Sequence, residues 1–132
     1  MILVDTTVWI DFFDDNPGTH VDILEYAIKN NQNICICGVI LTEILQGIHS
    51  NNEYNKTKTY LGQLIYLSMG QNIFLESAEI YRSLRKKGIT IRKPIDCMIA
   101  AVAIANNIPL LHNDRDFELI ENHLSLKTIK KK

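Results

Sequence analysis

Five carboxylates of this chain stand in or beside apolar runs, where an ionised side chain is unexpected. They are Asp5, Glu43, Asp96, Asp114 and Asp116. Asp5 directly follows Met1-Ile2-Leu3-Val4, and Asp114 comes shortly after Pro109-Leu110-Leu111. In an open α/β sheet, functional side chains gather at the carboxyl ends of the strands. We therefore expect these acids to converge on one pocket.

A pocket of this kind has a definite chemistry. Carboxylates crowded in a partly dry site repel one another, so protons or a cation must neutralise some of them. Oxygen ligands without a histidine and cysteine set favour Mg²⁺ or Mn²⁺ over zinc. Such an ion can activate water and neutralise charge that develops on phosphorus. The pattern indicates phosphodiester hydrolysis, in which a hydroxyl of Thr6 or Thr7 lies beside the ion or orients its water; a helix cap is the alternative role.

Each acid also has a local explanation. Asp96 and Asp116 fall in first helical turns, where the helix dipole favours negative charge. Asp5 and Asp114 could cap helices, and Glu43 could be a solvated helix residue. The joint arrangement favours a shared site, because all of these local explanations would otherwise have to hold independently. Four other aspartates of the N-terminal region are expected to be ordinary surface residues; they are Asp11, Asp14, Asp15 and Asp22.

The elements that must position these acids alternate between strand and helix. Apolar runs predict strands at 2–4, 34–37, 108–112 and 126–129, while 73–75 could be a strand or the entry to a helix. Helical spacing predicts helices over 6–13, 20–29, 39–48, 51–69, 77–87, 94–106 and 115–122. This alternation predicts an α/β fold with a parallel sheet flanked by helices.

Bulk properties narrow the class of protein. A chain of 132 residues fits a single domain, and its net charge of −1 does not indicate a nucleic-acid binder by itself. Residues 1–50 hold seven acids and one base, whereas most bases lie towards the C-terminus. This asymmetry could steer a polyanion past a metal site, or it could mark two solvated faces.

The three cysteines, Cys35, Cys37 and Cys97, have no disulfide or zinc spacing. We expect them to be small buried hydrophobic residues in a reducing, cytoplasmic protein. No signal peptide or transmembrane segment is expected, because Asp5 interrupts the first apolar run and the longest one is about half of what a membrane span needs.

Four motifs carry a family resemblance. The segment Val4–Phe12 resembles the opening of PIN domain ribonucleases and, more narrowly, of the VapC toxins of bacterial toxin–antitoxin pairs. Leu41–Gly47 is similar to their glutamate helix, Asp96–Ala101 to their central aspartate helix, and Leu110–Phe117 to their final acidic motif. The order, the spacing and the near-complete coverage of the chain make the resemblance specific.

The resemblance implies a three-layer α/β/α PIN-like fold over residues 1–132. The lysine tail at 130–132 is expected to be frayed, as chain ends usually are. It implies a Mg²⁺- or Mn²⁺-dependent endoribonuclease, with tRNA as the expected substrate class. It further implies a homodimer and a small VapB-like antitoxin that inhibits the enzyme by inserting a segment into the cleft.

The same resemblance assigns roles to the acids. Asp5, Glu43, Asp96 and Asp114 would be catalytic. The ion would be bound by Asp5, Asp96 and Asp114, with Glu43 and Asp116 acting directly or through water. Thr6, Thr7 and Asp116 would support the site; the two threonines replace the more usual Thr-Ser and keep the hydroxyl.

Several bases near Asp96 are candidates for contacting RNA phosphates. They are Arg82, Arg85, Lys86, Lys87, Arg92 and Lys93. The alternative is a solvated basic helix end.

Two other classes of protein compete with the nuclease. A phosphoacceptor receiver domain would carry paired acids after its first strand and a lysine near its last, but Asp5 is followed by Thr6-Thr7 and no lysine follows 108–112. A non-catalytic interaction module on the same scaffold is the third possibility. Metal-dependent RNA cleavage separates the nuclease from both.

Overall fold

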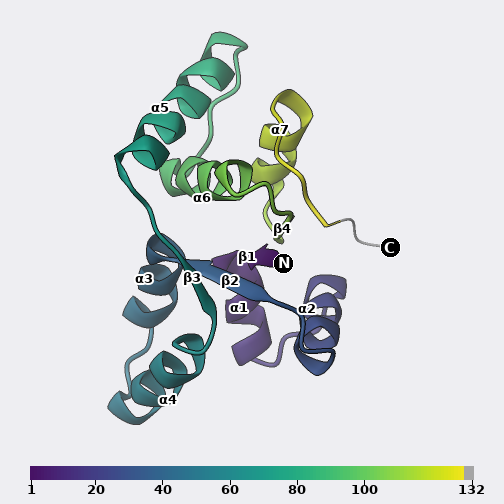
Figure 1. Cartoon of the computed structure of the whole chain (residues 1–132), viewed down its shortest axis with the longest axis vertical. Coiled ribbons are helices and arrows are strands. Elements are labelled where there is room, and N and C mark those ends of the chain that lie inside the picture. The colour runs from purple at the N-terminus through teal and green to yellow at the C-terminus, as the bar shows by residue number, and fades with distance from the viewer. Residues whose placement is uncertain (130–132) are drawn as a thin grey trace.

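A four-stranded parallel sheet forms the centre of the molecule (Figure 1). The computed structural model describes residues 1–129. Across the sheet the strands run in the order β3 (Ile65–Leu67), β2 (Ile34–Cys37), β1 (Ile2–Val4) and β4 (Leu110–Leu111). Each neighbouring pair is parallel, so all the carboxyl ends lie at one edge. The predicted α/β fold with a flanked parallel sheet is confirmed.

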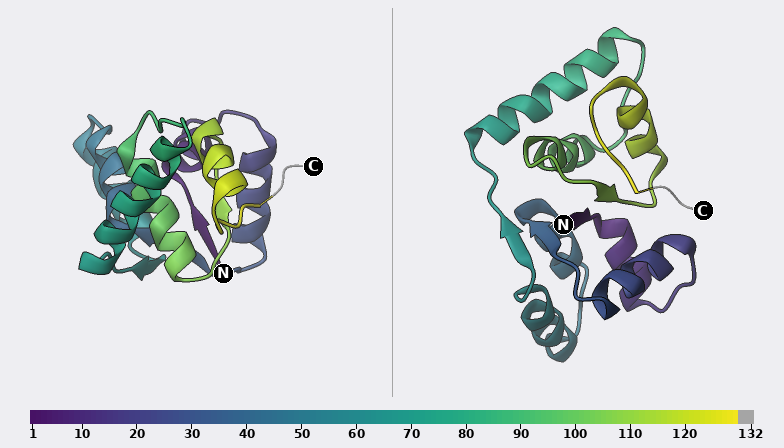
Figure 2. Two further views of the ribbon diagram at one scale, coloured as in Figure 1. Left: turned by 90° about the horizontal axis from the view of Figure 1, so that it is seen from above. Right: turned by 45° about the vertical axis from the view of Figure 1, so that its right-hand side comes forward.

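Helices cover both faces of the sheet, which explains why every residue of β1 and β2 is buried. Helices α1 (Thr6–Phe13), α2 (Thr19–Lys29) and α4 (Asn51–Leu61) lie on one side (Figures 1 and 2). Helices α5 (Gln71–Lys86), α6 (Pro94–Ala105) and α7 (Arg115–His123) lie on the other. Helix α3 (Gly38–Gln46) follows β2 and contacts both α1 and α6.

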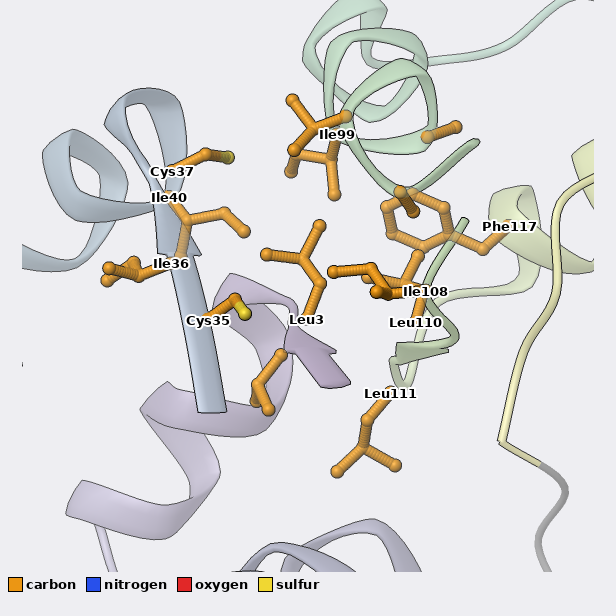
Figure 3. Packing of buried hydrophobic residues seen from close by; sticks show 14 of the residues in the cluster. Leu3, Cys35, Ile36, Cys37, Ile40, Ile99, Ile108, Leu110, Leu111 and Phe117 are labelled. Atoms are coloured by element: carbon orange, nitrogen blue, oxygen red, sulfur yellow. The ribbon is translucent and has the colours of Figure 1, made fainter. Parts of the chain in front are cut away.

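The core fixes helix α6 over the central strands. Leu3 of β1, Ile99 of α6, Leu110 of β4 and Phe117 of α7 are fully buried and form part of one cluster (Figure 3). Burying each such side chain contributes about 1.5–3 kcal/mol. Because α6 is held this firmly, the direction of its first turn is set by the packing of the rest of the helix.

The three cysteines belong to this core. Cys35, Cys37 and Cys97 are buried and unpaired, as predicted. Burial raises the pKa of Cys37 and of Cys97 to about 11, so both thiols are neutral at physiological pH. Among the described residues, none of the helices has the length and apolar character needed to cross a bilayer.

The single long helix predicted over 51–69 is wrong. Helix α4 ends at Leu61, Gly62 caps it, and Ile65–Leu67 form the edge strand β3. The apolar residues from Leu64 to Leu67 suit a helical stripe and a short strand equally well. The open edge of β2 decides between them, because it offers backbone partners to β3 through Cys35, Ile36 and Cys37.

Several other predicted boundaries also change. The helix predicted to begin at Ser77 begins at Gln71, so Ile73–Leu75 are helical and Ile73 is buried against the core. The strand predicted over 108–112 shortens to Leu110–Leu111. The strand predicted over 126–129 reduces to one bridge, in which Thr128 pairs with Leu110. The tail at 130–132, predicted to be frayed, lies outside the described residues.

Candidate active site

Three aspartates from two helices meet at the carboxyl edge of the sheet. One carboxylate oxygen from each of Asp96, Asp114 and Asp116 lies within 4.8 Å of the other two. Asp96 lies in the first turn of α6, Asp114 is the N-cap of α7, and Asp116 lies in the first turn of α7. We call these three residues the aspartate cluster. Asp96 and Asp116 are buried, and Asp114 is partly buried.

Asp96 is the member of the aspartate cluster whose charge is least compensated. Its side chain is almost fully buried, and its Oδ2 has no hydrogen-bond partner among the described residues. Burial, followed by the charges of Asp114 and Asp5, raises the pKa of Asp96 to about 7. Pro94 starts α6 without an N–H group of its own, so it supplies no donor to this carboxylate, and the charge of Lys93 only partly opposes the rise in pKa.

Asp114 has the opposite environment. Its Oδ1 accepts the backbone N–H of Asp116 at 2.9 Å, which caps α7. Lys93 Nζ lies 3.3 Å from its Oδ2, and Arg92 Nη2 donates to its Oδ1 at 3.3 Å. Burial tends to raise the pKa of Asp114, but these hydrogen bonds and positive charges outweigh it and lower the pKa. Asp114 is therefore ionised when Asp96 begins to take up a proton.

Arg92 also holds Asp116. Its backbone N–H donates to Asp116 Oδ2 at 3.1 Å, and its Nε lies 3.3 Å from both carboxylate oxygens. The side chains of Arg92 and Lys93 are 67% and 54% exposed, so only their charged ends engage the acids. The described structure therefore places Arg92 and Lys93, both predicted to contact RNA, on the aspartate cluster.

Asp5 is not a member of the aspartate cluster, whose three ligand oxygens all lie within 4.8 Å of one another. It is buried at the end of β1 and caps α1, and its Oδ2 accepts the backbone N–H of Thr7 at 3.1 Å and the Thr7 hydroxyl. Burial raises the pKa of Asp5; the Thr7 hydrogen bonds oppose this, and the charge of Glu43 adds to it. Thr7 Oγ1 also accepts the backbone N–H of Asn113, so it joins α1 to the loop that carries Asp114.

Glu43 reaches the same edge from α3. The hydroxyl of Thr6 donates to Glu43 Oε1 at 2.8 Å, which ties the glutamate to the first turn of α1. Cys37, which ends β2, is close enough to Asp5 and Glu43 for both charges to raise its pKa. Asp5 and Glu43 therefore lie at the edge that carries the aspartate cluster, but each is held by a threonine.

The predicted acids thus form two groups at this edge of the sheet. Asp96, Asp114 and Asp116 are in close contact, although Asp116 was expected to support the site or to bind the ion directly or through water. Asp5 and Glu43, expected among the principal acids, are joined to that cluster through Thr6, Thr7 and long-range charge.

The remaining basic candidates lie on α5 or at its end. Arg82 is paired with Glu79 at 2.8 Å, and Arg85 lies over the ring of Tyr81. Lys86 ends α5 and Lys87 caps it, and both are exposed. Arg82 and Arg85 thus contact residues of α5 itself. Their contact with RNA stays a prediction.

Sequence reasoning missed one buried polar pair. Asp11, expected to be an ordinary surface acid, is hydrogen bonded to the buried His20 at 2.6 Å and accepts Asn16 Nδ2 at 3.1 Å. The hydrogen bond with His20, followed by that from Asn16, lowers the pKa of Asp11. The His20 ring also lies over Gly18, where an added Cβ would be 2.5 Å from the ring, so a larger residue at position 18 would force the ring to shift. The spacing of these residues does not predict the pair.

The aspartate cluster fits a hard divalent cation. It offers only oxygen ligands, and one of them, Asp96 Oδ2, is buried without a donor among the described residues. Mg²⁺ is usually bound in proteins by one or two carboxylates and retains several of its waters, so these three aspartates offer enough ligands. A cation would supply the positive charge that the buried Asp96 lacks.

Comparison with known proteins agrees with this architecture. The PIN domain family model matches residues 2–122. Ribonuclease VapC11 of Mycobacterium tuberculosis is 32% identical over 129 residues, which is 96% of each chain. The crystal structure of VapBC2 from Rickettsia felis, bound to a DNA fragment from its promoter, has a chain with a TM-score of 0.76 and 26% identity, covering 100% of both chains. The DNA-bound VapBC of Salmonella typhimurium shares the fold with a TM-score of 0.76 at 22% identity, over 97% of this chain and 96% of that one. The chain belongs to the PIN domain family and, within it, to the VapC ribonucleases.

Proposed function

We propose that this chain is a Mg²⁺- or Mn²⁺-dependent endoribonuclease and the toxin of a toxin–antitoxin pair. The observation that carries the proposal is the buried, unpartnered Oδ2 of Asp96 beside Asp114 and Asp116 in the described part of the chain. Its relatives are named VapC ribonucleases, and similar solved structures are VapBC complexes. RNA is the proposed substrate, with tRNA as the expected class.

The proposed roles follow from the positions of the side chains. Asp96, Asp114 and Asp116 would hold the ion, with Asp5 joining them from the end of β1 and Glu43 acting directly or through water. When bound, the ion would supply an activated water and neutralise charge on the scissile phosphate. Thr7 connects Asp5 to the Asn113 loop, and Thr6 holds Glu43 at the edge of the sheet.

The hydrogen bonds of Thr6 and Thr7 hold two of the proposed ligands, Glu43 and Asp5, in position before an ion binds. Rigid carboxylates lose less conformational freedom on binding than mobile ones, which favours affinity. The charge imbalance left at Asp96 favours a cation in the same way. The protein therefore offers the proposed ion oxygen ligands that are already held in position.

We propose two protein partners. A VapB-like antitoxin would inhibit the enzyme by inserting a segment at the carboxyl edge of the sheet, in keeping with the VapBC complexes that share the fold. A second copy of the chain would form a homodimer. The proposed enzyme acts in the cytoplasm, and the proposal involves no membrane.

Cleavage of RNA by the purified protein tests the function. We expect Mg²⁺ or Mn²⁺ to support cleavage of a tRNA pool and EDTA to abolish it. Asp96→Asn should lower the rate by at least about 100-fold, because a charge-bearing ligand of the ion is lost. Cleavage that persists in EDTA, or that survives Asp96→Asn together with Asp5→Asn, would contradict the proposal.

A further inference from the structure

Arg92 and Lys93 have an unusual arrangement for exposed bases. Their stems lie at the surface, yet their charged ends turn inwards to Asp114 and Asp116. The charges of several acids act on Lys93: burial tends to lower its pKa, but the hydrogen bond to Asp114 and the charges of Asp96, Asp114 and Asp5 raise it overall. These two side chains are the positive charges that the described structure places on the aspartate cluster.

The ion pairs that Arg92 and Lys93 make with Asp114 and Asp116 can be broken and replaced by contacts with other groups. The side-chain distances are all 3.3 Å, at the long end for charge-assisted hydrogen bonds. The side chains of Arg92 and Lys93 are more than half exposed, so water screens them in part and holding them in place costs entropy, although their carboxylate partners are buried. Only the backbone N–H of Arg92, at 3.1 Å from Asp116 Oδ2, is fixed by the chain itself.

A bound divalent cation would weaken these ion pairs. An ion bound by Asp96, Asp114 and Asp116 would place two positive charges next to the Arg92 and Lys93 ends. Like charges at this separation repel, and the ion would offset two of the three negative charges that the ionised aspartate cluster can carry. The two bases would then be held less strongly, next to the ion, where the phosphate of a bound RNA must lie.

We propose that Arg92 and Lys93 form a cation-responsive phosphate clamp. They neutralise Asp114 and Asp116 while no ion is bound, and ion binding releases them to contact RNA phosphates. The inference rests on the proposed function, because it assumes that the site takes a divalent cation and RNA. By linkage, RNA held by these bases strengthens ion binding as much as the ion strengthens RNA binding.

The competing role for Arg92 is structural. If its side chain serves to hold Asp116 in position for the ion, removing it should weaken ion binding. If it acts as a counter-charge that the ion must displace, removing it should strengthen ion binding. The two roles therefore predict opposite signs for one measurable quantity.

Calorimetric titration with Mn²⁺ in the absence of RNA measures that sign. We expect Arg92→Gln to bind Mn²⁺ about three- to tenfold more tightly than the natural protein, as expected for losing one screened positive charge beside the ion. Arg82→Gln is the matched control, because it removes the same charge from an exposed arginine paired with Glu79 on α5. Unchanged or weaker Mn²⁺ binding by Arg92→Gln would overturn the proposal.

RNA binding supplies a second measurement. The dissociation constant of a labelled single-stranded RNA is determined at low temperature with EDTA and with Mg²⁺, and a gel verifies that the RNA is intact. We expect Mg²⁺ to tighten binding by the natural protein, and we expect Arg92→Gln with Lys93→Gln to lose most of that gain. An equal gain in the double variant would overturn the clamp.

Failure of the clamp and failure of the function give different results. If the natural protein binds no Mn²⁺ and cleaves no RNA, the proposed function is wrong. If it binds Mn²⁺ and cleaves RNA, but Arg92→Gln weakens Mn²⁺ binding while its melting temperature is unchanged, only the clamp is wrong. Such a result would assign Arg92 to positioning Asp116.

Discussion

The carboxylate of Asp96 is the group on which the proposed chemistry of this site depends. Its burial follows from the packing of α6, and its charge is opposed by Asp114 and Asp5. Groups whose pKa is strongly shifted by burial and by specific neighbours are typical of functional sites. The stability lost by placing an acid here would be recovered if the proposed cation binds to the folded state.

The ion-free protein should therefore lose stability as the pH rises towards 7. Between pH 4 and about 7 the unfolded chain gives up the Asp96 proton while the folded chain retains it, so the free energy of unfolding falls across this window. Asp96→Asn removes the effect. We expect thermal unfolding in EDTA at pH 8 to show this variant about 3–8 °C more stable, as for roughly 1–2 kcal/mol, with a smaller difference at pH 5.

Added Mn²⁺ provides the control for this prediction. It should raise the melting temperature of the natural protein and have little effect on Asp96→Asn, because the variant lacks the charge that attracts the ion. A difference between the two proteins that stays constant from pH 5 to pH 8 would show that proton uptake by Asp96 is not its origin.

At the residue scale, the acids were predictable from the sequence but their partners were not. Asp96 and Asp114 could be selected because each stands next to an apolar run that had to be a strand or a core helix. The pairing of Arg92 with Asp116 could not be selected, because it depends on where the segment before α6 lies relative to the first turn of α7. A helix cap and a place in the acidic site also proved compatible: Asp114 is the N-cap of α7 and a member of the aspartate cluster.

Among the elements, the turn after α5 determines where the Arg92–Lys93 segment starts. Gly88 has φ +80 and follows the last turn of α5, where its N–H donates to Arg85 O and the N–H of Ile89 donates to Leu84 O. This is a Schellman arrangement, which favours glycine because other residues are strained at positive φ. Ile91, which is buried, then fixes the segment just before Arg92.

Replacing Gly88 with alanine should destabilise the protein by about 1 kcal/mol, or about 3–5 °C in melting temperature. The cost is conformational, since an added Cβ has no neighbour within 4 Å among the described residues. Gly47→Ala is the matched control: Gly47 has φ −84 and ψ −6, and its added Cβ would make ordinary contacts at 3.7 Å. Thermal unfolding of both variants gives the comparison; equal losses would rule out the role of positive φ at Gly88.

The elements themselves were mostly predictable. Apolar runs and caps indicated β1, β2, α1, α6 and α7, because each has one clear pattern of burial. The division of 51–69 into α4 and β3 was not predictable from periodicity, since pairing with the edge of β2 supplied the deciding hydrogen bonds. Local sequence cannot report a partner strand that lies elsewhere in the chain.

For the whole molecule, exposed apolar side chains on α5 mark the surface on which the proposed homodimer would form. Phe74 and Leu75 are 46% and 62% exposed. Phe74 also borders a groove of about 350 Å³ that is lined by Tyr81, Pro94 and Met98. Neighbouring apolar side chains left in water are typical of protein interfaces.

Light scattering after size exclusion should show a dimer for the natural protein and a monomer for Phe74→Glu with Leu75→Glu. Two buried charges at an interface would remove several kcal/mol of association energy, roughly a 100-fold or greater loss of affinity. Tyr26→Glu is the control, because Tyr26 is 63% exposed on α2. A natural protein that is monomeric, or a double variant that remains dimeric, would place the interface elsewhere or remove it.

The order of the strands also determines when the acidic site can form during synthesis of the chain. Strand β1 is made first, yet it lies between β2 and β4, and Leu110 of β4 exchanges backbone hydrogen bonds with Lys127 and Ile129 near the end of the described chain. Asp5 is therefore joined by Asp114 and Asp116 only after residues 114–116 have been synthesised. A growing chain that has not reached this segment lacks two acids of the site, so the proposed nuclease activity can arise only once the segment has been made.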